Sequence, residues 1–382
     1  MFVQRVQGLR SSGRRVAGAV VAGGVMAGVL APSVAGAAQG GDGVQRGLDA
    51  FVRVDGVPGA VATVTGRDGR TRVYGAGVGD LATGARMPKD GQVRIGSATK
   101  TFVAVVVLQL VEEGRVRLDE KVEKYLPGLL RGKGVDGNAI TVRQLLQHTS
   151  GLPDFESDVT DDLLQRRYLA PRQTLAIALR HGAVFPPGTK WSYSNTNYLV
   201  AGMIVEKVAR RSLGAELDRR VIRRAGLKHT YFPAAAETAI RGRHPEGYRK
   251  VGSDTALHDV TEIDPSAAWA AGAMVSTTSD LDRFYSLLLR PGRLLKKAQL
   301  RQMRTTVPIK GSTARYGLGL ISWPLSCGGR YWSHSGSIPG FSTWAAATDD
   351  GRAATVALNV DPDSNEASWQ RLARFADDAL CR

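Results

Sequence analysis

Cysteine and histidine are scarce in this sequence of 382 residues, which holds two cysteines and six histidines. The histidines lie at positions 148, 181, 229, 244, 258 and 334, and none pairs with another at a spacing typical of metal ligands. A Gly-x-Ser-x-Gly turn and a His-Glu-x-x-His pair are also missing. These absences argue against a metal-dependent enzyme and a nucleophile-elbow hydrolase, and no metal or other cofactor is expected.

Acidic residues are fewer than basic residues, 35 against 51, so the formal net charge is +16. Nucleic acid is a common partner of such a chain. Because no helix-turn-helix, zinc-finger or aromatic-basic RNA-binding motif is present, no nucleic-acid partner is expected. An anionic cell wall or membrane surface suits an exported basic protein better, and solubility alone is the simpler explanation of the charge.

Long apolar runs are few, and the longest, Val16–Leu30, follows several arginines and precedes the small residues Ala35–Ala37. A membrane span needs roughly 17 to 25 apolar residues, so this run is short for one. The pattern is typical of a signal peptide over residues 1–38, and we expect a secreted protein near the cell wall. Its removal lowers the charge from +16 to +12, because the segment holds four arginines and no acid. Arg14-Arg15 leaves the export route, Sec or twin-arginine, open.

The two cysteines are Cys327 and Cys381, and an even pair in an exported chain favours one disulfide, which would staple the C-terminal helix. Two free buried thiols are the alternative. A single residue follows Cys381, so we expect no stable membrane anchor at this end, and we expect a monomer.

Hydrophobic periodicity predicts an opening helix and hairpin, a helical middle and a closing set of strands. The hairpin turns at Gly66–Gly69, and the helix at Thr101–Val111 is apolar on most sides. The other predicted helices are at residues 44–55, 141–148, 173–180, 196–210, 213–225, 280–289, 297–304 and 365–380, and the closing strands are at 316–322, 329–334, 341–348 and 353–360.

These elements predict an α/β fold with a helical insertion. Residues 39–115 and 255–382 are expected to form one antiparallel β-sheet flanked by helices, because short links between the closing strands favour antiparallel pairing. Residues 116–254 are expected to form a mainly helical, all-α domain.

A hydroxyl and an amine lie three residues apart in Ser97-Ala98-Thr99-Lys100, directly before the apolar helix. In the first turn of a helix this spacing puts Ser97 and Lys100 on one face, so the amine can activate the hydroxyl as a nucleophile. Burial against the apolar helix would lower the pKa of Lys100. The motif alone is weak, because serine is a common helix cap and lysine an ordinary surface residue.

A second motif is Tyr193-Ser194-Asn195, which precedes the helix predicted from Thr196. In an extended segment residues i and i+2 face the same way, so Tyr193 and Asn195 can point to one site. Tyr193 would share a proton with Ser97 and Lys100, and Asn195 would hold a substrate carbonyl and orient Lys100. A buried tyrosine followed by an asparagine helix cap is the plainer explanation.

A third motif is His334-Ser335-Gly336-Ser337, on a predicted strand. Gly336 would let a substrate backbone lie close to the strand. The backbone N–H groups of Ser337 and Ser97 would then form an oxyanion hole. A strand histidine followed by a glycine bulge is the alternative.

With the three motifs in this order, the sequence resembles the serine penicillin-recognising superfamily, and most closely its secreted D-alanyl-D-alanine carboxypeptidase and class C β-lactamase-like branch. The resemblance covers roughly residues 45–382. It extends to Leu108–Gly114, Thr141–Leu146, Ser150–Leu152, Tyr316–Leu320 and both cysteines.

The resemblance implies a fold like that of serine β-lactamases and penicillin-binding proteins. It implies Ser97 as nucleophile, Lys100 and Tyr193 as the acid–base pair, and His334 as a cationic or hydrogen-bonding group. Asn195, Ser335, Gly336 and Ser337 would contact substrate. The implied activity is that of a D-alanyl-D-alanine carboxypeptidase or transpeptidase acting on peptidoglycan-type stem peptides, with β-lactams acylating Ser97 as inhibitors or substrates.

One departure from the family pattern concerns residues 321–325, which read Ile-Ser-Trp-Pro-Leu. Such carboxypeptidases often carry an arginine there that holds the substrate's terminal carboxylate. A missing charge-assisted contact is worth roughly 1.5 to 3 kcal/mol of selectivity. An esterase, a D-amino-acid amidase or aminopeptidase, or a β-lactamase on the same scaffold therefore stays open. A non-catalytic cell-wall or β-lactam-binding protein also stays open, since a fold alone does not establish catalysis.

Overall fold

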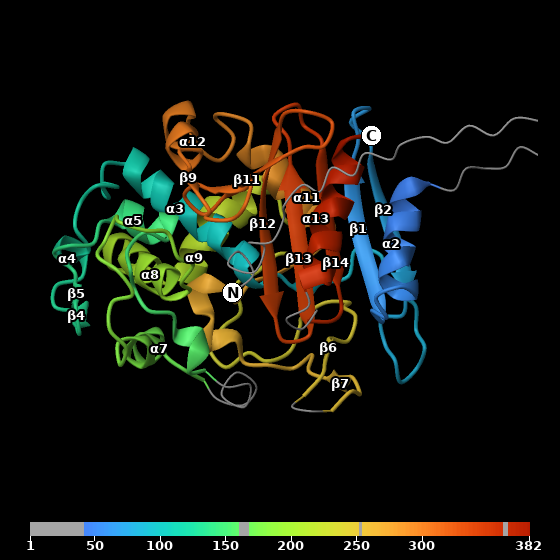
Figure 1. Ribbon diagram of the computed structural model, residues 1–382, viewed down its shortest axis with the longest axis horizontal. Coiled ribbons are helices and arrows are strands. Elements are labelled where there is room, and N and C mark those ends of the chain that lie inside the picture. The colour runs from blue at the N-terminus through green and yellow to red at the C-terminus, as the bar shows by residue number, and fades with distance from the viewer. Residues whose placement is uncertain (1–41, 160–167, 252–253, 362–365) are drawn as a thin grey trace, which may run out of the picture.

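A computed structural model of the protein describes residues 42–159, 168–251, 254–361 and 366–382. The expected signal peptide, residues 1–38, lies outside the described residues. Figure 1 shows an open sheet on one side of the molecule and a mainly helical part on the other.

The main sheet has eight strands in the order β2-β1-β14-β13-β12-β11-β10-β9, and every neighbouring pair is antiparallel. The strands are β1 (Gly59–Thr65), β2 (Thr71–Gly77), β9 (Val307–Pro308), β10 (Arg315–Tyr316), β11 (Ile321–Pro324), β12 (Arg330–Ile338), β13 (Phe341–Ala347) and β14 (Ala353–Leu358). Short ladders join β3 (Val93–Arg94) to β8 (Val275–Ser276), β4 (Arg131–Gly132) to β5 (Val135–Asp136), and β6 (Tyr248–Arg249) to β7 (His258–Asp259).

Strand β1 joins the two ends of the chain, because it pairs with β2 on one side and with β14 on the other. Its side chains alternate between two buried layers, as the strand period of two requires. Ala60 and Ala62 belong to one apolar cluster, whereas Val61 belongs to the other. The antiparallel sheet predicted from both chain ends is therefore confirmed.

Helices α2 (Gly43–Arg53) and α13 (Glu366–Leu380) cover one face of this sheet, and α11 (Thr278–Leu288) covers the other (Figure 1). The rings of Phe51 and Phe375 pack with centroids 6.0 Å apart. Thr63 of β1 exchanges a hydrogen bond of 2.8 Å with Thr278 of α11. The sheet is thus buried on both faces.

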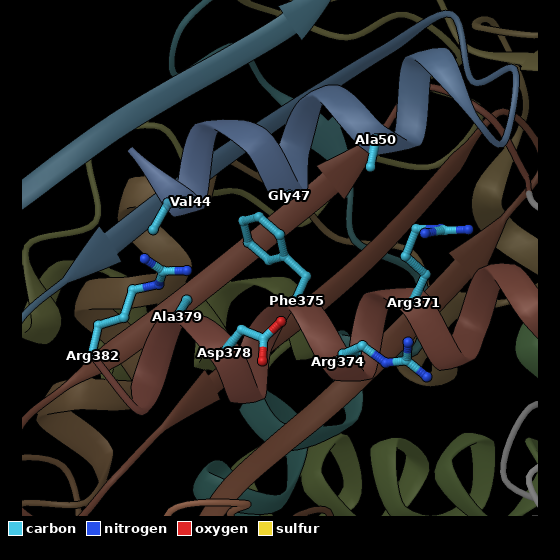
Figure 2. A pocket seen from close by; sticks show the side chains of 10 residues that line it. Val44, Gly47, Ala50, Arg371, Arg374, Phe375, Asp378, Ala379 and Arg382 are labelled. Atoms are coloured by element: carbon cyan, nitrogen blue, oxygen red, sulfur yellow. The ribbon is translucent and has the colours of Figure 1, made fainter. Parts of the chain in front are cut away.

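A hollow lies on the seam between α2 and α13 (Figure 2), and none of its lining residues belongs to the three sequence motifs. Val44, Phe375 and three arginines are among its lining residues. One of these arginines, Arg371, is paired with Asp55 at 2.5 Å, and another, Arg382, packs over Gly43. The seam is therefore partly filled by its own side chains.

The helical part is built around α3 (Thr99–Glu112) and α8 (Thr196–Ala209), which pack against each other. Helix α3 is buried from Thr99 through Leu110, as its nearly unbroken apolar sequence predicts. The shorter helices are α4 (Val122–Tyr125), α5 (Val142–Gln147), α7 (Pro171–Ala178), α9 (Leu213–Leu217), α10 (Arg223–Ala225) and α12 (Lys297–Met303). A π-helical turn, Asp218–Ile222, joins α9 to α10 inside the helix predicted over residues 213–225.

One predicted strand is wrong in its extent. Residues 316–322 form the end of β10, a turn and the start of β11, because Gly317 N–H donates to Leu320 O at 2.7 Å. Gly319 has φ +70° and lies where a Cβ would come within 2.7 Å of both the Ala104 methyl and the Tyr198 hydroxyl. The alternating Tyr-Gly-Leu-Gly-Leu pattern imitates a strand, but its glycines serve a turn packed against α3 and α8.

The predicted disulfide joins Cys327 to Cys381, with an S–S distance of 2.04 Å and Cα atoms 5.7 Å apart. It ties the turn between β11 and β12 to the end of α13. The alternative of two free thiols is therefore wrong. In the part of the chain that the structure describes, no helix is both long enough and apolar enough to cross a membrane.

Candidate active site

Ser97 lies in a short 3₁₀ turn, Gly96–Ala98, that leads directly into α3. This turn packs against β12 so closely that side chains are excluded from the seam. A Cβ at Gly96, which has φ +47°, would lie 2.6 Å from Ser337 O and 2.7 Å from Ser337 N. A Cβ at Gly336 would overlap the carbonyl oxygen of Ile95. The two glycines thus bring the Ser337 backbone beside the half-buried Ser97.

Lys100 is fully buried in the first turn of α3, and its Nζ has three oxygen neighbours. It lies 2.9 Å from Ser97 Oγ, 2.7 Å from Asn195 Oδ1 and 2.7 Å from Ala271 O. The amide and carbonyl oxygens can only accept hydrogen bonds, so they take two N–H groups of the amine. In the neutral amine, the lone pair is then left facing the Ser97 hydroxyl.

The electrostatics favour that neutral amine. Burial lowers the pKa of Lys100 to about 7, while the carboxylates of Asp154 and Glu156 oppose the shift. A large fraction of Lys100 is therefore unprotonated at neutral pH, which lets it act as a base.

Asn195 connects Lys100 to these two acids. Its Nδ2 donates to Asp154 Oδ2 at 3.2 Å and to Glu156 Oε2 at 2.9 Å. Since carboxylates only accept, this fixes the amide orientation and turns Oδ1 toward Lys100. Asp154 is half-buried and Glu156 is exposed, so the acidic pair borders the solvent side of the site.

Tyr193 is also a neighbour of Ser97, whose side chain partly offsets the effect of burial on the pKa of the phenol. Burial raises the pKa of Tyr193 well above its usual value, so the phenol stays protonated at neutral pH. Lys100 Nζ lies 5.0 Å from the centre of the tyrosine ring. Tyr193 is thus placed to pass a proton to or from Ser97 as a neutral donor.

His334 lies on β12, and its ring centre is 6.5 Å from that of Tyr193. Burial, helped by the charge of Lys100, lowers the pKa of His334 to about 3. Of the two roles expected for this residue, cationic or hydrogen-bonding, the structure favours the hydrogen-bonding one. Ser335 is buried, whereas Ser337 is exposed and its hydroxyl donates to Asp361 at 2.9 Å. Because its hydroxyl is engaged, Ser337 can contact a substrate through its backbone.

The structure brings the three sequence motifs together around Ser97, and it adds residues that the sequence did not reveal. Asp154 and Glu156 follow Ser150-Gly151-Leu152, where Asp154 caps a single 3₁₀ turn, Phe155–Ser157, that is too short to show a periodic pattern. Ala271 contacts Lys100 through its backbone carbonyl oxygen, and a pattern of side chains in the sequence does not predict such a contact. In the sequence, His148 is only a histidine at the end of a predicted helix, and Tyr316 is only the start of a predicted strand and of a stretch that resembles the family.

Comparison with known proteins identifies the family of this chain. The Beta-lactamase family model matches residues 44–377. Penicillin-binding protein 4 of Amycolatopsis lactamdurans is 31% identical over 273 residues, which are 69% of each chain. Penicillin-binding protein 4* of Bacillus subtilis (strain 168) is 28% identical over 282 residues, which are 71% of this chain and only 61% of that protein.

Solved structures with the same fold include a D-stereospecific amidohydrolase from Streptomyces sp. It is 39% identical, with a TM-score of 0.79, over 87% of this chain and 96% of that one. The D-amino acid amidase of Ochrobactrum anthropi SV3, solved with L-phenylalanine amide, is 27% identical with a TM-score of 0.76 over the same shares. The chain belongs to the Beta-lactamase family, within the serine penicillin-recognising superfamily.

Proposed function

We propose that the protein is a serine hydrolase that forms an acyl-enzyme at Ser97 and cleaves amides of D-amino acids whose amino group is free. The observation that carries this proposal is the acidic pair Asp154 and Glu156 beside Asn195. A substrate ammonium group at the mouth of the site would meet these carboxylates, and charge-assisted hydrogen bonds of this kind are among the stronger ones.

The proposed reaction uses the contacts around Ser97. Neutral Lys100 takes the hydroxyl proton as Ser97 Oγ attacks the amide carbonyl, and the backbone N–H groups of Ser97 and Ser337 hold the oxyanion. The proton then passes through Lys100 or Tyr193 to the leaving amine, which departs as the acyl-enzyme forms. Water attacks the ester, and Ser97 regains its proton.

Two further points support an amino-terminal rather than a carboxy-terminal specificity. Residues 321–325 contain no arginine, and Ile321 is buried, so that stretch offers no anchor for a terminal carboxylate. The structural relatives named D-stereospecific amidohydrolase and D-amino acid amidase match this chain over 96% of their own length. The preference for D-amino acids is taken from those relatives.

A second candidate is the D-alanyl-D-alanine carboxypeptidase expected from the motifs. It is favoured by the relatives named penicillin-binding proteins, which are similar to this chain in sequence. In that case the acyl donor would be a peptidoglycan-type stem peptide, and β-lactams would acylate Ser97.

A substrate panel separates these candidates. The secreted or refolded enzyme is incubated with D-phenylalanine amide, L-phenylalanine amide, N-acetyl-D-phenylalanine amide and diacetyl-Lys-D-Ala-D-Ala, with Ser97→Ala as the blank. We expect Ser97-dependent release of ammonia from D-phenylalanine amide and little from its L-isomer or its N-acetyl form. Release of D-alanine alone would establish the carboxypeptidase instead, and an inactive enzyme on all four would reject both.

A further inference from the structure

Behind the nucleophile a line of hydrogen bonds joins two histidines through one tyrosine. His148 Nε2 lies 3.1 Å from the Tyr316 hydroxyl, which lies 3.0 Å from His334 Nε2. His148 ends α5, Tyr316 belongs to β10 and His334 to β12, so the line crosses from the helical part to the sheet. Each of the three side chains is at most 1% exposed.

Backbone groups fix the proton positions at both ends of this line. The Ser194 N–H donates to His148 Nδ1 at 3.2 Å, and Asn197 Nδ2 also lies 3.2 Å from that nitrogen. Because Nδ1 accepts, the proton of neutral His148 is on Nε2, which donates to Tyr316. At the other end His334 Nδ1 lies 2.7 Å from the Ser335 carbonyl, so it must donate there.

The tyrosine hydroxyl then has one consistent role. His334 carries its proton on Nδ1, so its Nε2 accepts from Tyr316 O–H, while Tyr316 oxygen accepts from His148. The two histidines are thus neutral and hold opposite tautomers. A second proton on His148 would face the Ser194 N–H, and a second proton on His334 would face the Tyr316 donor.

The charged and titratable groups around the line reinforce neutrality. Lys100 of α3 is the cation that acts on both histidines, and burial together with this charge lowers both of their pKa values. Among the described residues, the phenols of Tyr193 and Tyr198 also border the line, and burial raises their pKa values as it raises that of Tyr316 itself.

The line also touches the acid–base residue Tyr193. The His148 ring lies 4.3 Å from the Tyr193 ring, centre to centre, at an interplanar angle of 32°. The Nδ1 atom of His148 accepts a hydrogen bond from the backbone N–H of Ser194, the residue that follows Tyr193 in the chain. His148 itself adopts φ 59° and ψ 37°, a left-handed conformation that is costly for a residue other than glycine and persists where the surroundings fix it.

We propose that His148 and Tyr316 are positioning residues, which hold Tyr193 against Ser97 and fix His334 as the neutral Nδ1–H tautomer. Lys100, and not His334, is then the group of the site that titrates near neutral pH. This inference rests on the serine-hydrolase site and not on the substrate proposed above.

The first test needs no substrate. In protein labelled with ¹⁵N-histidine, long-range ¹H–¹⁵N spectra report the tautomer of each ring, and His148→Gln assigns one signal. We expect an Nε2–H tautomer for His148, an Nδ1–H tautomer for His334, and no titration of either between pH 5 and pH 9. Two rings with the same tautomer, or a His334 that protonates in this range, would overturn the inference.

The second test removes the central hydroxyl with Tyr316→Phe, and uses Tyr331→Phe as the matched loss of a buried tyrosine hydroxyl elsewhere on the sheet. Without the donor to its Nε2, the pKa of His334 should rise. We expect acylation by p-nitrophenyl acetate to fall about tenfold or more and its pH profile to gain a new acid-side titration. A Tyr316→Phe profile that keeps the shape of the Tyr331→Phe profile would reduce Tyr316 to a packing residue.

Discussion

The side-chain oxygen of Asn195 lies 2.7 Å from the side-chain nitrogen of Lys100, while the nitrogen of the same amide faces two carboxylates. Asn195 thereby separates a buried base from an acidic pair at the solvent side. The carboxylates still act on Lys100 through space, because they raise a pKa that burial lowers. The pKa of Lys100 therefore depends on both burial and the two carboxylates, and the pH dependence of activity should reflect both.

The acid limb of the activity profile should belong to Lys100. Because the pKa of Lys100 is about 7 and only the neutral amine is a base, kcat/KM should rise with pH through an apparent pKa near that value. Lys100→Met should lower acylation by about three orders of magnitude or more and remove the limb. The measurement is the pH dependence of p-nitrophenyl ester hydrolysis. A limb that survives in Lys100→Met would assign the titration to another group.

Neutralising the acidic pair should shift that limb and weaken one class of substrate. The double variant Asp154→Asn, Glu156→Gln removes charges that raise the pKa of Lys100, so the acid limb should move to lower pH. For D-phenylalanine amide, KM should also rise by about tenfold or more, as expected for loss of a charge-assisted contact.

The ester substrate, which has no ammonium group, should show the pH shift without the change in KM. Asp158→Asn is a suitable control, because Asp158 lies in the same loop but is hydrogen-bonded to His181. An equal loss on the ester and the amide would mean that the two acids only orient Asn195.

Burial of Lys100 should also lower the free energy of unfolding by an amount that depends on pH. The folded-state pKa of Lys100, about 7, is below the ordinary lysine pKa of 10.5, so between these values the unfolded chain binds more protons. This contribution to stability therefore rises with pH through that window. Lys100→Met removes it, and the Tm difference, variant minus wild type, should fall between pH 7 and pH 10. Calorimetry across this range checks the slope, with the exposed Lys190→Met as control; a constant difference would contradict it.

Much of the fold could be predicted because its pattern is local. The apolar run of α3, the hairpin around Gly66–Gly69 and the alternating strands β13 and β14 all show in the sequence. The spacing of Ser97 and Lys100 and the family order of the motifs pointed to the residues that meet around the nucleophile. The strand predicted over 316–322 is wrong because its glycines are required by tertiary packing. The alternation of residue types along the sequence carries no information about that packing.

The remainder of the site depends on contacts between distant segments. Glu156 meets Asn195 across 39 residues, and Tyr316 meets His148 across 168. Neither pair has a periodic signal in one sequence. The Ala271 carbonyl is a backbone group, so any residue at that position would supply it.

The seam between the nucleophile's turn and β12 should be intolerant of a single methyl group. Gly336→Ala would drive a Cβ into the carbonyl oxygen of Ile95, and Ser337 would move away from Ser97. We expect acylation to fall by about two orders of magnitude or more, as for loss of an oxyanion donor. Gly75→Ala on β2 is the matched control, since the atom nearest to its Cβ would be 3.7 Å away. Burst kinetics with the ester, alongside circular dichroism of both variants, measure this, and normal acylation in Gly336→Ala would show that the seam can open without loss of the site.

The disulfide should stabilise the sheet domain without taking part in catalysis. Cys327 and Cys381 are 54 residues apart, and the chain-entropy model assigns a loop of that length about 4 kcal/mol. The bond fastens the end of α13, whose Leu372 and Leu380 are buried, whereas Ser97 belongs to a separate element, the turn that packs against β12 and leads into α3. Cys327→Ser with Cys381→Ser should therefore lower the Tm and the urea midpoint while leaving kcat/KM at 20 °C within about twofold. Reduction of the wild-type protein should reproduce the loss of stability, because it removes the same cross-link. Loss of activity in the folded double variant would instead show that the position of α13 is coupled through the sheet to the active site.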